Sequence, residues 1–265
     1  MTAPPVRTTR TGGSSLRFPI CLVLVGSLLG SACTRQPGSA PAASPGATSA
    51  GRATVTMARF SPPQARRYTK FTATIPVLHD PRDAHTAQLI NSDLRAVIGA
   101  SIKEHLKDER EVGFEPGTFA VRSIVRYFRF DLFSVEMRTT STTPMSMQPA
   151  MDSITRNYWL ADGRVITFDD LFLDDADHLW TIAHRIVEQI PRGIRFREHP
   201  EQLMSEVVDI VYDSNYLIAD RGLRFVFPPC QIGPCTSGYI ETIVSFRDLA
   251  RVIDPEGPLG RFRNP

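Results

Sequence analysis

The longest β-type run in the chain, FAVRSIVRYFRFDLFSVEMRTTST at residues 119–142, constrains the fold more than any other segment. Its apolar residues share one parity, as they would on the buried face of a strand: Val125, Tyr127, Phe133, Val135 and Met137. An ordinary strand has only about five or six residues. We therefore predict a long, half-buried strand that is bulged or bent in two.

Helices and further strands flank this run in mixed order. Apolar residues spaced three and four apart predict helices at residues 83–109, 174–190 and 200–212. A strand is expected at residues 68–76, at a sheet edge because it stops at a proline. Short strands and a short closing helix are expected between residues 215 and 253. This mixed order predicts an α+β fold, with a largely antiparallel sheet and two to three packed helices.

The start of the chain has the features of an export signal. Residues 1–17 carry three arginines and no acidic residue, and an apolar run from Phe18 to Leu29 follows. This run is shorter than the roughly 20 apolar residues that a membrane-spanning helix needs. A basic start, a short apolar region and small residues before Cys33 are typical of a secretory signal. We predict that residues 1–32 are a signal peptide.

Cys33 and the segment behind it predict how the exported protein is held in the cell envelope. The small residues before Cys33 suit a lipobox, which makes Cys33 the acylated first residue of a lipoprotein. The Pro, Ala, Ser and Gly of TRQPGSAPAASPGATSAG cannot bury a core, so we expect a disordered tether at residues 33–66. We place one domain at residues 67–254 and a tail at 255–265. The alternative is an ordinary signal peptide that leaves Cys33 free and the protein secreted.

The charge balance argues against a nucleic-acid partner. The chain has 30 Lys and Arg residues against 28 Asp and Glu residues, and the signal peptide accounts for three of the arginines. A nucleic-acid-binding domain needs a basic patch. The cluster VRYFRF at residues 125–130 places Arg126 and Arg129 among aromatic residues, a pattern more typical of a half-buried sheet. We expect contact with the membrane through the lipid anchor only.

A family resemblance enters with the C-terminal segments. GRVITFDDLF, an amphipathic helix and then NYLIADRGLRFVFPPCQIGPCTSGYIETIVSFRDL resemble the RsiV-like family. This family includes the ectodomain of a lysozyme-sensing anti-sigma factor and a secreted immunogenic protein of mycobacteria. The similarity is specific over residues 163–250. It implies a compact α+β domain outside the membrane that binds an envelope protein or a cell-wall ligand, with a muramidase-type protein as one such partner.

Two departures from the family pattern bear on binding. Residues 139–153, TTSTTPMSMQPAMDS, stand where the family has a turn of the type TGGAH, so ligand contacts made there do not carry over. Cys230 and Cys235 stand where the family loop has two tyrosines. This loop of the present chain therefore has to be interpreted from its own residues.

The pair Cys230 and Cys235 suggests a metal site, a redox couple or a disulfide. A zinc site needs about four ligands, and the spacing of His178, His184 and His199 supplies no matching set. A thioredoxin-type couple has two residues between its cysteines, rather than four. Neighbouring thiols oxidise outside the cytoplasm. We therefore predict a Cys230–Cys235 disulfide and no metal.

The cysteine loop is also the predicted recognition surface. Its prolines and the disulfide stiffen the backbone, so that the loop loses less entropy when it meets a partner. The residues expected to take part are Pro228, Pro229, Gln231, Ile232, Pro234 and Tyr239. The alternative is that the disulfide only closes one end of the core.

Sequence motifs for catalysis are missing. The chain contains no G-x-S-x-G elbow, H-E-x-x-H motif, phosphate loop or dinucleotide fingerprint. The acidic run from Asp169 to Asp177 lacks the spacing of a calcium loop and is interpreted as helix capping and solvated surface. His184 is interpreted as a packed histidine at the edge of the core. We favour a non-catalytic binding domain without a cofactor over the alternative, a cell-wall hydrolase or deacetylase.

Overall fold

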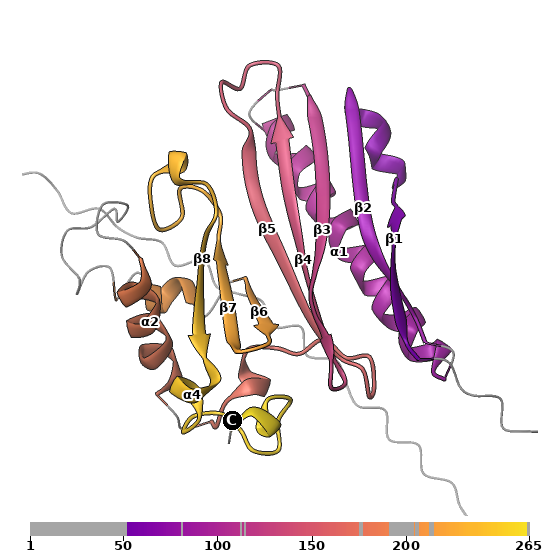
Figure 1. Ribbon diagram of the computed structural model, residues 1–265. Helices are drawn as coiled ribbons and strands as arrows, with labels where there is room; N and C mark the ends of the chain where they lie inside the picture. Colours follow the sequence, from indigo (N-terminus) through magenta and orange to yellow (C-terminus); the bar gives the residue numbers. More distant parts are fainter. Residues whose placement is uncertain are drawn as a thin grey trace, which may run out of the picture. The chain divides into compact units, whose positions relative to one another are not determined.

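The computed structural model describes residues 52–80, 82–111, 113, 115–174, 177–190, 204, 207–211 and 215–263. The predicted signal peptide and Cys33 lie outside these ranges. The described residues form two β-sheets and several helices, which confirms the predicted α+β class (Figure 1). No helix in these ranges is long and apolar enough to cross a bilayer.

The larger sheet has five strands in the order β1-β2-β3-β4-β5. Its strands are β1 (Thr54–Arg59), β2 (Lys70–His79), β3 (Thr118–Arg129), β4 (Leu132–Thr142) and β5 (Ala150–Trp159). Only β2 and β3 pair in parallel. A parallel pair needs a crossover connection, and helix α1 (Ala84–Glu111) supplies it.

Helix α1 covers one face of this sheet, as Figure 1 shows. Its apolar stripe is buried against the sheet and includes Ile90, Leu94, Ile98 and Ile102. The first turn is capped where the Thr86 amide donates to Asp83 Oδ1 at 2.9 Å. The predicted helix at residues 83–109 is therefore confirmed.

The long β-type run forms the β3–β4 hairpin. The chain reverses at Phe130 and Asp131, which have φ angles of 53° and 60°. A bulge between Val125 and Tyr127 shifts the register, so these two residues face opposite sides of the sheet despite their shared parity. Val125 is 36% exposed, whereas Tyr127 is only 4% exposed. The bend and the bulge were predicted, but the prediction that Val125 and Tyr127 lie on the same face was wrong.

The N-terminal boundary of the domain was predicted too late. Strand β1 pairs with β2 along its whole length, inside the segment assigned to the tether. The Pro, Ala, Ser and Gly bias ends near residue 51, and TVTMAR provides β-forming residues. Strand β2 therefore lies inside the sheet and not at its edge. Because β3 pairs with β2 only as far as Thr74, Pro76 lies beyond that ladder and β2 continues to His79.

The smaller sheet is antiparallel and has three strands: β6 (Tyr216–Ala219), β7 (Gly222–Phe227) and β8 (Ile240–Ser245). Helices α2 (His178–Gln189) and α4 (Phe246–Leu249) pack on it and share its hydrophobic core. The predicted helix at residues 200–212 lies largely outside the described residues. Its described residues, 204 and 207–211, are helical, and both Val207 and Val211 are fully buried.

The C-terminal residues are not a free tail. The 3₁₀ helix η5 (Gly260–Phe262) follows Leu259, which is fully buried. The Phe262 ring stacks on Phe246 with a centroid distance of 4.4 Å. The domain therefore continues through residue 263, because these apolar side chains complete the smaller core. Prolines and glycines in this stretch had suggested a tail.

Candidate binding surface

The loop between β7 and β8 is closed by a disulfide. Cys230 and Cys235 are joined with an S–S distance of 2.06 Å. Cys230 has a φ of 73°, and a short 3₁₀ helix, η4 (Cys235–Ser237), leads out of the ring. The structure thus contains the predicted disulfide, at the end of a hairpin whose strands belong to the smaller sheet.

The residues of this loop divide into an outer and an inner set. Gln231, Thr236 and the two cysteines are exposed, and the three prolines are half-buried. Ile232, in contrast, is only 2% exposed and packs into the smaller core. The prediction that Ile232 belongs to the recognition surface is therefore wrong, since its apolar side chain is drawn inward. Ile232 instead anchors the loop from below.

Tyr239 fixes the far end of the loop to the larger sheet. Its hydroxyl donates to the Asp152 carbonyl of β5 at 2.8 Å, and the Arg138 guanidinium lies 4.2 Å from its ring centroid. Burial raises the pKa of Tyr239 to about 12, so the hydroxyl keeps its proton at neutral pH. The disulfide loop is therefore held by its own ring, by Ile232 and by Tyr239.

A charged cluster lies beside Tyr239 and joins the two sheets. Glu136 is fully buried and accepts hydrogen bonds from Arg126, at 2.6 Å, and from Arg138. Glu241 on β8 accepts from Arg126 at 3.2 Å, and also from Arg138 and Arg224. Buried charges are tolerated when they are paired in this way. Sequence reasoning missed this cluster, because its members lie on four different strands.

The pKa of Glu241 reflects these neighbours. Burial opposes ionisation, but the charge of Arg126 and the hydrogen bonds from Arg138 and Arg224 outweigh it and lower the pKa. Three guanidinium groups thus surround two carboxylates. The arginine side chains remain 21–25% exposed, which confirms that Arg126 lies in a half-buried sheet.

The connection between β4 and β5 lies at the same end of the domain as the disulfide loop. Tyr239 contacts the paired residues Asp152 and Thr139, close to the ends of both strands. Beyond them the chain turns where Ser146 Oγ donates to the Thr143 carbonyl at 2.9 Å. Met145 and Met147 are 77% and 101% exposed. This methionine tip, residues 143–149, occupies the middle of the predicted 139–153 insertion. Residues 139–142 belong to β4 and residues 150–153 belong to β5.

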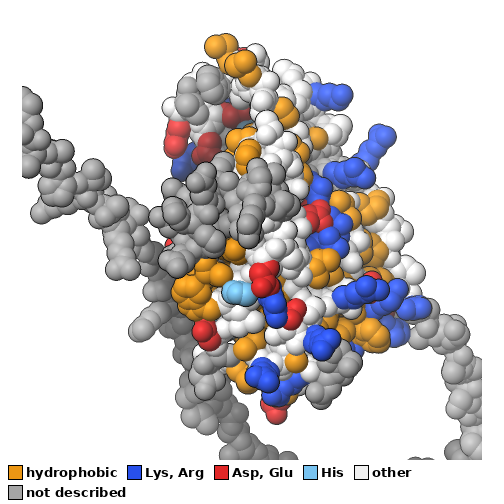
Figure 2. All heavy atoms as spheres, turned by 60° about the vertical axis from the view of Figure 1, so that its left-hand side comes forward, with side chains coloured by type: hydrophobic (Ala, Val, Ile, Leu, Met, Phe, Trp, Pro, Cys, Tyr) orange, Lys and Arg blue, Asp and Glu red, His pale blue; other side chains and the backbone are white. Residues whose placement is uncertain are grey.

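The other candidate residues that the structure describes do not come together as a site. Asp170 accepts from the Thr167 amide at 2.6 Å and pairs with Arg164 at 2.9 Å. Asp177, the residue before α2, makes no side-chain capping hydrogen bond, and the first turn of α2 has no acidic residue, so the predicted capping of this helix was wrong. Among the described residues, no three His, Cys, Asp or Glu side chains are grouped to hold a metal. His184 is 59% exposed on α2, so its assignment to the edge of the core was wrong. Figure 2 shows acidic and basic side chains mixed on one face of the protein, with hydrophobic groups between them.

Comparison with known proteins places the fold. A crystal structure of a DUF3298 family member from Bacteroides fragilis aligns with 81% of this chain and 98% of its own, at a TM-score of 0.58 and 12% identity. A DUF3298 family protein from Pseudomonas aeruginosa aligns with 77% of this chain and 94% of its own, at a TM-score of 0.48 and 12% identity.

The sequence alone finds no such relatives. No family profile matches it, and no curated protein matches it significantly. The structural alignment nevertheless shows that the chain shares the fold of the Bacteroides protein. At this level of identity the likeness extends to the fold alone, and the narrower RsiV-like assignment stays a prediction.

Proposed function

We propose that this chain is an exported lipoprotein of the cell envelope, anchored through Cys33, whose α+β domain binds another protein and catalyses no reaction. The disulfide-closed loop carries this proposal. The loop is held by the Cys230–Cys235 bond, by buried Ile232 and by the hydroxyl of Tyr239. It nevertheless presents Gln231 and Thr236 to solvent. A loop that is ordered before binding gives up little entropy when a partner docks.

The methionine tip supports the same conclusion. Met145 and Met147 are 77% and 101% exposed, although methionine is among the residues most often buried. Methionine is flexible and polarizable, and it is common on surfaces that adapt to a partner. A rigid polar loop beside an adaptable apolar tip suits a protein partner better than a small ligand, which needs a concave pocket.

A muramidase-type protein is the first partner to test, because of the resemblance to a lysozyme-sensing ectodomain. The soluble domain, residues 52–265, is titrated with lysozyme and separately with peptidoglycan fragments by isothermal calorimetry. We expect saturable binding of lysozyme. If neither titration releases or absorbs heat, a muramidase or wall partner is contradicted. Cleavage of the wall fragments would favour the hydrolase alternative.

Variants locate the surface. The Met145→Ser/Met147→Ser pair and the Cys230→Ser/Cys235→Ser pair are each expected to weaken binding at least tenfold, or about 1.4 kcal/mol. Met57→Ser is the matched control, because Met57 is 50% exposed on β1 in the larger sheet. If both double variants bind as the control does, the partner docks elsewhere and the disulfide only closes the core.

A further inference from the structure

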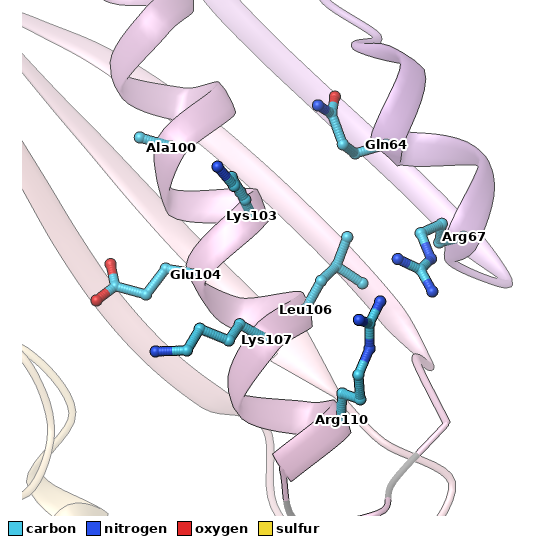
Figure 3. A pocket seen from close by; sticks show the side chains of 8 residues that line it. All are labelled: Gln64, Arg67, Ala100, Lys103, Glu104, Leu106, Lys107 and Arg110. Atoms are coloured by element: carbon cyan, nitrogen blue, oxygen red, sulfur yellow. The ribbon is translucent and has the colours of Figure 1, made fainter.

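A groove lies beside the larger sheet. The residues that line it are far in the sequence from the cysteine loop. It has a volume of about 570 Å³ and separates the 3₁₀ helix η1 (Pro63–Arg67) from the C-terminal half of α1 (Figure 3). Its lining residues are Gln64, Arg67, Ala100, Lys103, Glu104, Leu106, Lys107 and Arg110. Four of these side chains are cationic and one is anionic.

The two walls of the groove are firmly placed. Helix η1 is anchored by Ala65, which is buried, and by the next residues of the chain. There the Thr69 amide and hydroxyl both donate to the Gly117 carbonyl, at 2.8 and 2.7 Å. On the other wall, Leu106 is 7% exposed and joins the core of the larger sheet. Arg67 and Arg110 thus extend from backbones held in fixed positions.

Three of the four cations that line the groove form no ion pair with a described residue. Lys107 pairs with Glu111 at 3.7 Å, and both of these side chains are largely exposed. Within the described ranges, Arg67, Lys103 and Arg110 form no ion pair with any residue. Figure 3 shows the guanidinium groups of Arg67 and Arg110 directed toward one another beside Leu106, whereas Glu104 points away from both.

The buried carboxylate of Glu109 forms no ion pair with either arginine. Glu109 is 4% exposed, and its Oε1 lies 3.0 Å from His105 Nε2. A second hollow of about 470 Å³ continues the groove past the same two arginines and Leu106. It adds one acidic residue, Glu115. The two arginines therefore stand at the centre of a continuous depression with excess positive charge.

We propose that this groove binds an anionic amphiphile, with a phosphate or carboxylate between Arg67 and Arg110 and its apolar part on Leu106 and Ala100. Guanidinium groups bind such oxyanions through two parallel hydrogen bonds each. The apolar floor beside them removes hydrocarbon from water. A site of this kind combines an apolar lining with a few convergent polar groups, as ligand pockets usually do. It is separate from the surface assigned to the protein partner.

Arg110 also has a structural role in α1, and the test must distinguish this role from ligand binding. It lies in the last turn of α1, where a cation is favoured by the helix dipole. That role predicts a loss of stability on substitution, with no specific effect on a ligand. Thermal unfolding of each variant is therefore measured beside its binding.

The test uses the soluble domain and three probes: monomeric dodecyl phosphate, inorganic phosphate, and dodecyl maltoside, which has the same alkyl chain without a charge. We expect dodecyl phosphate to bind at least tenfold more tightly than either of the other two. Arg67→Gln and Arg110→Gln should each weaken its binding at least fivefold. Arg66→Gln is the matched control, an exposed arginine of η1 that does not line the groove, and should change binding less than twofold.

Several outcomes would overturn the proposal. Equal binding of dodecyl maltoside would show that the charge plays no part, and equal binding of inorganic phosphate would show that the apolar floor plays none. Equal effects of Arg66→Gln and Arg67→Gln would reduce the site to general basicity. Binding to phosphatidylglycerol vesicles without binding of monomeric dodecyl phosphate would replace the groove by a membrane-surface contact.

Discussion

Asn157 is expected to be the side chain on which the joining of the two sheets depends most. It lies on β5 and is 2% exposed. Its amide nitrogen donates to the Tyr216 carbonyl at 3.0 Å, and its oxygen accepts from the Ile218 amide at 3.0 Å. These two groups point away from β7, along the free edge of β6. The Asn157 amide thus makes the two hydrogen bonds to β6 that a neighbouring strand would otherwise make.

The cost of removing this amide follows from burial. Each buried backbone group that loses its only partner costs about 1–3 kcal/mol. Asn157→Ala leaves one donor and one acceptor unpaired, so we expect a loss of about 3 kcal/mol in the free energy of unfolding. For a domain of this size, that corresponds to a fall in Tm of roughly 6–12 °C. Asn157→Leu restores the volume without the hydrogen bonds and should lose at least ~2 kcal/mol.

Chemical denaturation of the soluble domain measures this loss, and Gln189→Ala is the matched control. Gln189 on α2 makes the same pair of hydrogen bonds to the free edge of β8, donating to the Ile243 carbonyl at 2.9 Å and accepting from its amide at 3.0 Å. These bonds are exposed, so water replaces them and the loss should stay near 0.5–1 kcal/mol. If Asn157→Ala costs no more than Gln189→Ala, burial does not set the strength of these contacts and the reasoning fails.

Two further predictions concern the anchor and the charged cluster. Cys33→Ala should move the protein from the membrane fraction into the medium, because acyl chains supply nearly all of the bilayer affinity; unchanged fractionation would contradict a lipid anchor. Glu241 has a lowered pKa in the folded state, so its stabilising contribution is complete above the unfolded value of about 4.5 and is lost as the pH falls through the folded pKa. The free energy of unfolding, measured from about pH 6 to pH 3, should therefore fall less steeply in Glu241→Gln than in the native domain. If the two pH curves are parallel, Glu241 is not coupled to Arg126, Arg138 and Arg224.

The elements that the sequence predicted well are those with a strong local signal. The stripe of α1 repeats every three and four residues through Ile90, Leu94 and Ile98, and its register needs no knowledge of the rest of the chain. The disulfide was predicted from two cysteines near each other in a chain that we expect to be exported. The β3–β4 reversal was expected because one strand of that length is uncommon.

The sequence-based predictions failed where contacts between distant segments determine the structure. Strand β1 is short and exposed, and only pairing with β2 makes it a strand. Ile232 lies in a loop that looked solvent-facing, but the smaller core has room for it. The charged cluster joins residues of β3, β4, β7 and β8, and no spacing in the sequence shows that Arg126 and Arg138 share Glu241 as a partner.

The same device of a side-chain amide on a free strand edge appears a third time, and it explains how this fold protects its sheets. Asn91 on α1 donates to the Leu78 carbonyl and accepts from the Leu78 amide, both at 2.8 Å, where β2 extends beyond its pairing with β3. An unpaired strand edge invites association with other chains. Asn91, Asn157 and Gln189 each cover one such position with a donor and an acceptor. Because an amide carries both groups on one side chain, it satisfies the backbone without a further strand.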